Sequence, residues 1–276
     1  MSSIISIEEQ DQLAESADQH EEPATERLVK SGERVRDLGE VFTPSATVQE
    51  MLNLLPSSVW DIYPSPTFLE PACGDGNFLV AILARKLDRI AEAFEEGSLP
   101  AGDDAEAAQF HALEALASIY AVDISIDNII GGTPGHEVGA RSRLIAMFVE
   151  WNADKLSKQL TARTLVLRAA EWIVEHNLIV GNMLPFDAAG KPTGRDNLPL
   201  VDYGFDPATL SVTLMKTTMG DVLASEEAKT AAALSLFGPA EPEALWQGKA
   251  VNLAEADRVK APQLRGPARN GTGRRS

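Results

Sequence analysis

The segment 67–79 (TFLEPACGDGNFL) constrains the fold of this chain more than any other. It begins with apolar residues, breaks at Glu70-Pro71, passes through two glycines and then becomes amphipathic. This order is typical of a buried strand, a tight loop and a helix. Gly74 and Gly76 have no Cβ atom, so a ligand can approach the backbone of the loop closely.

The residues after the loop predict a helix from Asn77 to about Phe94. Its apolar face is formed by Phe78, Leu79, Ile82 and Leu83. A strand, glycine loop and helix at the carboxyl edge of a parallel sheet form the cofactor site of open α/β folds. Glycine turns also join strands to helices where no ligand binds, so an ordinary turn is the competing interpretation.

Composition fits a soluble globular protein of one domain with additions, because 44% of the 276 residues are apolar and 24% are charged. No run is long and apolar enough to span a bilayer, and the N-terminus lacks a signal-peptide pattern. The single cysteine, Cys73, excludes an internal disulfide and fits a reducing compartment. We therefore expect a cytoplasmic protein without a membrane partner. Cys73 has no neighbouring histidine in sequence, and we interpret it as a small loop residue.

The formal net charge of −17 bears on the choice of partner. A surface that binds duplex DNA is expected to be basic, because it must neutralise phosphates. A local basic face is compatible with an acidic chain, but the charge favours DNA contact through a partner chain or another domain.

A second strand is predicted at 118–124 (SIYAVDI), and the carboxylate of Asp123 lies at its end. An acidic side chain in this position can accept hydrogen bonds from both ribose hydroxyls of a nucleoside cofactor. An acidic, turn-rich insertion at 95–109 widens the usual interval of about 20 residues after the glycine loop. An aspartate that caps the next helix is the competing interpretation.

Further elements are predicted on either side of these. Thr43 and Pro44 are suited to the N-cap and first position of a helix with Val48, Met51, Leu52 and Leu55 on one face. The segment 177–186 (NLIVGNMLPF) predicts a third strand and a turn. The remaining predictions are helices near 106–116 and at 138–151, 153–176 and 222–237, a loop at 188–199 and strands within 200–215.

The glycine segment resembles the first motif of AdoMet-dependent DNA methyltransferases, above all the class that methylates the amino group of adenine. In that class an acidic-Pro-x-Cys-Gly-x-Gly-x-Phe-Leu string cradles S-adenosyl-L-methionine (AdoMet). The segment 39–44 (GEVFTP) is similar to the segment that precedes this loop in the adenine-specific enzymes, where it lies over the methionine end of the cofactor. Both motifs occur in the family's order, and the resemblance extends over roughly residues 39–184.

This resemblance implies a Rossmann-like methyltransferase fold, with a mostly parallel sheet and helices on both faces. It implies AdoMet as cofactor, DNA as partner, and a restriction–modification or phage context with a specificity or endonuclease subunit. Asp123 would hold the ribose, Ile124 would flank the adenine, and Asn182 would replace the family's aspartate as acceptor for the adenine amino group. The cofactor-binding residues expected on this basis are Phe42, Thr43, Glu70, Ala72, Gly74, Gly76, Asn77, Phe78, Asp123, Ile124 and Asn182.

The family's catalytic motif is not evident. Amino-methyltransferases carry Asn or Asp followed by Pro-Pro and an aromatic residue, which bind the target amine and stack on the flipped base. The segment 182–186 (NMLPF) keeps these residue types out of register in Asn182, Pro185 and Phe186, and 202–205 (DYGF) keeps fewer. The segment 181–184 is therefore open to two interpretations, an adenine contact or a degraded catalytic motif.

Three regions are predicted along the chain: a disordered acidic leader at 1–30, an AdoMet-binding methyltransferase-like domain at 31–240 and a flexible basic tail at 241–276. The arginines and lysine of 258–275 either touch phosphates or remain solvated. No metal-ligand spacing, phosphate-loop lysine motif or nucleophile elbow occurs in the sequence.

The function indicated first is AdoMet-dependent transfer of a methyl group to the exocyclic amine of adenine in DNA. Such a transfer is in-line, and the protein contributes positioning and charge placement without a covalent intermediate. The missing motif and the net acidity favour an alternative, a catalytically incomplete AdoMet-binding module or subunit that needs a partner. A methyltransferase for a substrate other than DNA is the third interpretation.

Overall fold

The computed structural model describes Arg36 and residues 42–132 and 137–225. The chain divides into two units, residues 1–44 and 45–276, and the second unit carries the glycine segment. Several sequence predictions lie outside the described residues. These are the leader at 1–30, the segment 39–41, the helix at 222–237 beyond residue 225 and the tail at 241–276.

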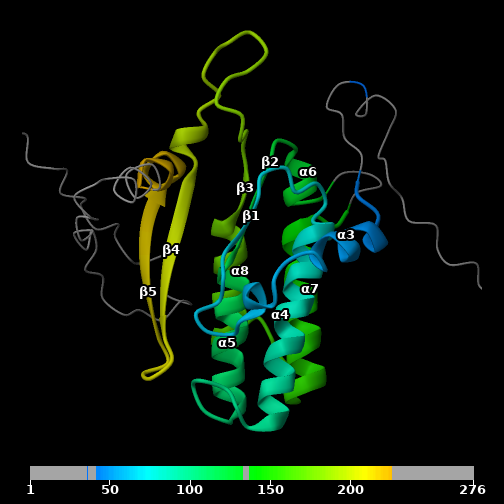
Figure 1. Ribbon diagram of the computed structural model, residues 1–276, viewed down its shortest axis with the longest axis vertical. Helices are drawn as coiled ribbons and strands as arrows, with labels where there is room; N and C mark the ends of the chain where they lie inside the picture. The colour runs from blue at the N-terminus through cyan, green and yellow to red at the C-terminus, as the bar shows by residue number, and fades with distance from the viewer. Residues whose placement is uncertain (1–35, 37–41, 133–136, 226–276) are drawn as a thin grey trace, which may run out of the picture. The chain divides into compact units, whose positions relative to one another are not determined.

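A parallel sheet forms the centre of the second unit (Figure 1). It contains β1 (Phe68–Glu70), β2 (Ile119–Asp123) and β3 (Leu178–Val180), in the order β1-β2-β3. All three strands were predicted from the sequence, and the mixed α/β class is confirmed. Among the described residues, however, the parallel sheet has only three strands.

Helices connect the strands and precede them. The first group is α3 (Ser45–Leu52), the 3-10 helix η1 (Ser57–Trp60), α4 (Asn77–Glu96) and α5 (Ala105–Ala117). The second group, between β2 and β3, is α6 (Ile126–Ile129), α7 (Ala140–Leu156) and α8 (Leu165–Asn177). After β3 come η2 (Arg195–Asn197), the antiparallel hairpin of β4 (Pro199–Asp206) and β5 (Ser211–Thr218), and helical residues 219–225. Among the described residues, no helix is long and apolar enough to cross a membrane.

The two faces of the sheet are covered differently. Ile119 and Ala121 of β2 pack in the main core with buried side chains of α4, α5, α7 and α8. Val122 lies in a smaller core with Leu200 of β4 and Met219. Because successive side chains of a strand point to opposite faces, the long helices cover one face, and β4 with the segment 219–225 covers the other. The expectation of helices on both faces is therefore met in the described residues by long helices on one face only.

Helix boundaries follow local chemistry. The helix α4 buries Leu79, Ile82 and Leu83, as its amphipathic pattern predicts. It ends at Gly97, whose left-handed backbone (φ of 66°) allows its N–H to bond back to the last turn. Asp104 caps α5, since its side chain accepts a hydrogen bond of 2.8 Å from the backbone N–H of Ala107.

The sequence predicts one helical stretch at 153–176, and this prediction is wrong for residues 157–164, which are not helical. The helix α7 ends because Ser157 adopts a left-handed backbone with φ of 53°, and the N–H of Lys158 bonds to the carbonyl of Asn152. Thr164 then accepts a 2.9 Å hydrogen bond from the N–H of Thr161 just before α8. Leu165 is exposed at the start of α8. Apolar spacing alone did not reveal the left-handed residue Ser157 or the turn at 161–164.

A buried polar network lies at the amino-terminal end of the sheet, away from the glycine loop. Lys86 of α4 is 3% exposed, and its Nζ donates to Ser65 Oγ at 2.7 Å and to the Pro66 carbonyl at 2.8 Å. Glu114 of α5 accepts a 3.0 Å hydrogen bond from the N–H of Ser65, and its other oxygen lies 3.1 Å from His111 Nδ1. The network therefore anchors the connector before β1 to α4 and α5.

The buried Lys86 side chain makes the stability of this fold depend on pH. Burial lowers the pKa of Lys86 from 10.5 to about 8, although nearby Glu114 opposes the shift. Between these values the unfolded state binds more protons than the folded state, so the free energy of unfolding should rise with pH. We expect a gain of about 2 kcal/mol between pH 8 and pH 10.

Urea unfolding at both pH values measures this gain. The free energy of unfolding should stop rising near pH 10. Burial raises the pKa values of Tyr120 and Tyr203, so at that pH unfolding releases protons from these tyrosines. The variant Lys86→Met should lack the rise. A rise of equal size in the variant would show that another group is responsible.

Candidate functional site

The glycine loop, residues 71–76, joins β1 to α4 at the carboxyl edge of the sheet. Both glycines have left-handed backbone, with φ of 55° at Gly74 and 93° at Gly76, which side chains other than glycine rarely tolerate. A Cβ atom at Gly76 would lie 2.9 Å from the Cβ of Ala140 in α7. The missing side chain of Gly76 therefore makes room for α7, and the half-buried Gly74 is the glycine nearer the surface.

Asp123 lies directly against this loop. One carboxylate oxygen, Oδ2, accepts a 2.8 Å hydrogen bond from the N–H of Gly74. The other, Oδ1, accepts from the N–H of Ser125 at 2.8 Å and from the side-chain amide of Asn128 at 2.9 Å. Two residues predicted to bind one cofactor are thus in contact, although 49 positions separate them in sequence.

The three donors limit what Asp123 can still accept. A carboxylate offers about four acceptor positions, so about one remains for a ligand hydroxyl. The side chain is 7% exposed. Asp123 also organises the start of α6 through Ser125 and Asn128, as the competing interpretation of a strand-end cap expects. Contact with both ribose hydroxyls would require one protein donor to be displaced.

Glu70 adds a second carboxylate to the edge. It ends β1, and its Oε1 accepts a 3.2 Å hydrogen bond from the N–H of Ala72 within the loop. Burial raises the pKa of Glu70; the hydrogen bond from Ala72 lowers it, and the charge of Asp123 raises it. Ala72 is exposed on the loop surface. Glu70 therefore lies close enough to Asp123 for their charges to interact, and Ala72 is bound to Glu70.

Cys73 has a structural place in the loop. Its backbone N–H donates to the carbonyl of Val122 in β2 at 3.1 Å, which ties the loop to the neighbouring strand. Burial raises the pKa of the Cys73 thiol well above its usual range, and the charges of Asp123 and Glu70 raise it further. A thiol that stays protonated is a poor nucleophile, in agreement with its interpretation as a loop residue.

Asn77 and Phe78 begin α4 behind the loop. Asn77 Oδ1 accepts a 3.0 Å hydrogen bond from Arg143 Nη2, and Phe78 is partly buried against the main core. Arg143 also donates to the carbonyl of Asp75 at 2.8 Å and lies 3.2 Å from its carboxylate. Arg143 was not predicted as a site residue, because it lies on a helix 66 positions after Asn77 and no local pattern marks it.

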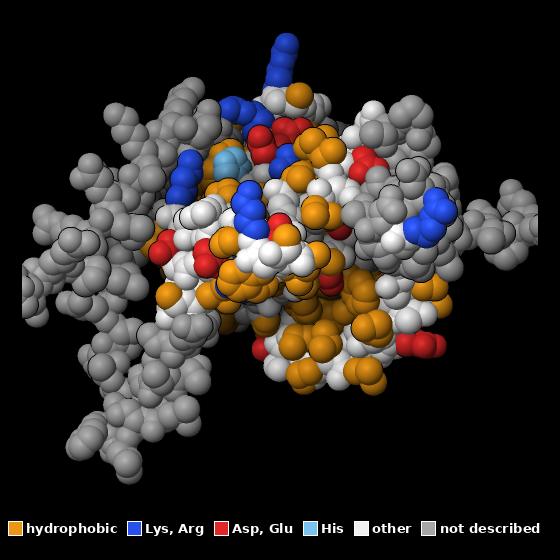
Figure 2. All heavy atoms as spheres, turned by 90° about the horizontal axis from the view of Figure 1, so that it is seen from above, with side chains coloured by type: hydrophobic (Ala, Val, Ile, Leu, Met, Phe, Trp, Pro, Cys, Tyr) orange, Lys and Arg blue, Asp and Glu red, His pale blue; other side chains and the backbone are white. Residues whose placement is uncertain are grey.

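Apolar side chains are exposed at the same edge. Ile124 directly follows Asp123, and Val180 lies opposite Asp123 at the end of β3. Ile126 and Ile130 are exposed on and after α6. Figure 2 looks down on this end of the molecule and shows hydrophobic side chains interspersed with charged ones. The edge therefore combines carboxylates with an apolar surface, of which the sequence indicated only Ile124.

The catalytic candidates lie on the loop after β3. Gly181 donates its N–H to the carbonyl of Asp123 at 2.9 Å, which places Asn182 just beyond the strand. Asn182 Oδ1 accepts a 2.9 Å hydrogen bond from the N–H of Leu184, and the Pro185 carbonyl accepts one of 3.2 Å from Thr193. The amide oxygen and the proline carbonyl that a target amine would need each already accept a hydrogen bond within this loop.

The two aromatic candidates differ in position. Phe186 is exposed and forms an isolated β-bridge with Pro192. The segment between β3 and η2 is the loop that projects at the top of Figure 1. In the segment 202–205, Tyr203 donates to Asn177 Oδ1 at 2.8 Å and Phe205 packs edge-on against Phe110. The segment 202–205 is thus part of β4. Its aromatic side chains pack against the core, away from the carboxyl edge, and Asp202 is exposed.

Phe42 and Thr43, the first predicted contacts, belong to the unit 1–44. Phe42 is buried and Thr43 half-buried. Because the glycine loop belongs to the other unit, the structure does not define the position of either residue relative to that loop. Their expected contact with the methionine end of AdoMet stays a prediction.

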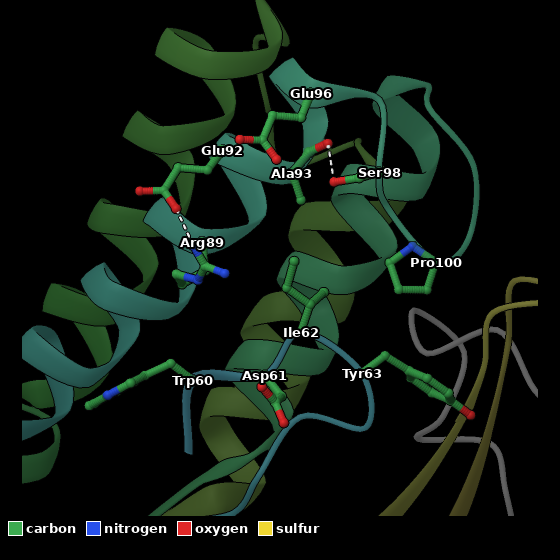
Figure 3. Close-up of a pocket in the computed structure, with 10 residues that line it drawn as sticks. All are labelled: Trp60, Asp61, Ile62, Tyr63, Arg89, Glu92, Ala93, Glu96, Ser98 and Pro100. Carbon is green, nitrogen blue, oxygen red and sulfur yellow. Dashed lines mark hydrogen bonds and ion pairs between the residues drawn. The ribbon is translucent and has the colours of Figure 1, made fainter. Parts of the chain in front are cut away.

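Two surface hollows lie elsewhere on the second unit. A cleft of about 270 Å³ lies between the connector before β1 and the end of α4 (Figure 3). In this cleft Arg89 pairs with Glu92, and Ser98 Oγ donates to the Ala93 carbonyl at 3.4 Å. A groove of about 440 Å³ is lined by residues of α7 and α8. Neither hollow is lined by the glycine loop or by Asp123. Within the described residues, no cluster of three or more His, Cys, Asp or Glu side chains is arranged to hold a metal ion.

Comparison with protein-family models, with curated proteins and with solved structures found no match to this chain. The interpretation of the site therefore depends on its own geometry and on the sequence motifs.

Proposed function

We propose that this chain binds AdoMet at the carboxyl edge of its sheet, in a Rossmann-like fold, and serves the methylation of adenine N6 in DNA. One observation carries the proposal: the 2.8 Å hydrogen bond between the N–H of Gly74 and the Asp123 carboxylate. It joins the glycine loop to the acidic end of the next strand, where open α/β folds bind nucleoside cofactors.

The charges of the edge favour a cationic ligand. Glu70, Asp75 and Asp123 place three carboxyl groups on or beside the loop, and Arg143 pairs with Asp75. AdoMet has a sulfonium centre, and such a centre is attracted by carboxylates in a partly buried site. Ile124 and Val180 offer exposed apolar surface for the adenine ring. These features support AdoMet rather than a phosphorylated cofactor.

Different residues of the chain would contact different parts of AdoMet. The loop backbone at Ala72 and Gly74 would lie along the cofactor, and Asp123 would accept a ribose hydroxyl with its remaining position. AdoMet, when bound, supplies an electrophilic methyl group. The choice of DNA adenine as acceptor depends on the resemblance of segments 39–44 and 67–79.

The extent of the sheet favours a second candidate function, an AdoMet-binding module that needs another polypeptide to methylate. In doubly wound folds the first strand is central, with the order 3-2-1-4-5-6. Here β1 is the edge of a three-stranded sheet, and Leu69 on β1 is 46% exposed. The half of the sheet beyond β1 is absent from the described residues, as is an assembled catalytic motif.

A methyl-transfer assay separates the two functions. The full chain is incubated with tritiated AdoMet and unmethylated DNA, and AdoMet binding is measured in parallel. AdoMet binding without transfer of label to DNA is the result that the binding module predicts, because the Asn182 side chain and the Pro185 carbonyl already accept hydrogen bonds within the loop after β3. Transfer to unmethylated DNA but not to DNA premethylated at adenine N6 would establish a complete enzyme. Absence of AdoMet binding would contradict both functions.

A further inference from the structure

The two terminal nitrogens of Arg143 donate hydrogen bonds to the last part of the glycine loop and to the first residue of α4, and these paired contacts form the Arg143 fork. Arg143 lies near the start of α7, and its Nη1 donates to the Asp75 carbonyl at 2.8 Å while lying 3.2 Å from the Asp75 carboxylate. Its Nη2 donates to Asn77 Oδ1 at 3.0 Å. The side chains of Arg143 and Asp75 are 30% and 22% exposed, so the contact is partly shielded from water.

The same face of α7 contacts the residue between these two. Ala140 lies one helical turn before Arg143, and a Cβ atom at Gly76 would come within 2.9 Å of the Ala140 Cβ. Three consecutive positions, Asp75, Gly76 and Asn77, are therefore held by one helix. The planar guanidinium can reach two acceptors at once in a fixed geometry, which a lysine ammonium cannot reproduce.

Arg143 also changes the charge of the site. Among the ion pairs of the described residues, the pair of Arg143 with Asp75 is the one that brings a cation to the glycine loop. Glu70, Asp75 and Asp123 supply negative charge there. A positive charge beside the loop weakens the attraction for a cationic ligand and has little effect on a neutral one. AdoMet carries one net positive charge, whereas its demethylated product, S-adenosyl-L-homocysteine, is neutral overall.

We propose that Arg143 is a positioning residue that fixes the glycine loop for AdoMet and sets the affinity of the site for AdoMet relative to S-adenosyl-L-homocysteine. This inference depends on the proposed AdoMet binding and adds a residue outside the motif that suggested it. The hydrogen bonds of the fork hold the loop backbone in place for AdoMet and for S-adenosyl-L-homocysteine alike. The positive charge of Arg143 lowers the affinity for the cationic AdoMet relative to that for the neutral product.

Two variants separate these effects, and a third is the control. Arg143→Lys keeps the charge but loses the fork, whereas Arg143→Met loses both. Arg141→Lys is matched to them, because Arg141 lies on the same helix and donates to the carbonyls of Glu175 and Leu178 without contacting the loop. Calorimetric titration of each full chain with AdoMet and with S-adenosyl-L-homocysteine gives the two affinities, and urea unfolding gives the stability.

We expect Arg143→Lys to weaken the binding of both ligands by about tenfold, with their affinity ratio unchanged, as for one lost charge-assisted hydrogen bond. In Arg143→Met both affinities should fall, and the ratio should shift about fivefold toward AdoMet. Arg141→Lys should bind both ligands as the wild type does. The ratio is the decisive measurement, because a loss of stability alone would lower both affinities equally.

The inference is overturned if Arg143→Lys and Arg143→Met bind both ligands with wild-type affinity and ratio. It is also overturned if Arg141→Lys loses as much affinity as Arg143→Lys. Where Arg143→Met does not fold, Arg143→Lys still decides the role of the fork, because urea unfolding shows whether this variant is fully folded under the conditions of the titration. A wild-type chain that binds neither ligand overturns the proposed function and this inference together, whereas wild-type binding that is insensitive to Arg143 overturns the inference alone.

Discussion

The variant Asp123→Ala should bind AdoMet about a hundredfold more weakly than the wild type, a loss of about 3 kcal/mol. Three contributions are lost together. The site loses a carboxylate that favours the sulfonium, the ribose loses its acceptor, and the N–H of Gly74 loses the partner that fixes the loop. Each charge-assisted hydrogen bond contributes about 1.5–3 kcal/mol, and the three effects overlap because they share one side chain.

The measurement is a calorimetric titration with AdoMet, in which Asp88→Ala serves as the control. Asp88 is an exposed residue of α4, so its replacement changes the net charge by the same amount without touching the loop. Circular dichroism shows whether each variant is folded. Equal AdoMet affinities for folded Asp123→Ala and Asp88→Ala would contradict the assignment of Asp123 to the cofactor site.

The second large effect is on stability. Gly76→Ala should lower the free energy of unfolding by about 3 kcal/mol. Part of the cost comes from placing a side chain at φ of 93°, and part from the Cβ contact of 2.9 Å with Ala140. Both atoms are attached directly to the backbone, so neither can rotate away, and the loop or α7 must shift.

Gly190→Ala is the matched control for this variant. Gly190 has a similar positive φ of 76°, but a Cβ atom there meets no atom within 4 Å. Its replacement should cost about 1 kcal/mol from backbone strain alone. Urea unfolding of the two variants isolates the contact with α7. If they lose equal stability, the close approach of α7 to the loop is not important for the fold.

The parts of the fold that were predicted from sequence are those with a local signal. The order apolar run, glycines and amphipathic helix located β1, the loop and α4 within a few residues. The same strand, loop and helix also indicated the α/β class. The break between α7 and α8 was missed, since apolar spacing continues across it and the cause is the left-handed backbone of Ser157.

The site was predictable only where its residues follow strands. Asp123 and the glycine loop lie at ends of adjacent parallel strands, so topology brings them together. Arg143 and Asn128 carry no such signal, because their contacts depend on which face α7 and α6 turn toward the edge. The number and order of the strands in the sheet could not be predicted either, since they are set by long-range pairing.

The central claim is that AdoMet binds at the loop 71–76 beside Asp123. The most direct test is an amide NMR titration of the full chain with AdoMet, in which each backbone N–H reports its own surroundings. We predict saturable shifts at Gly74 and Ile124, with no shift at Gly190. Saturable shifts confined to other parts of the chain, or none at millimolar AdoMet in a folded sample, would contradict the claim.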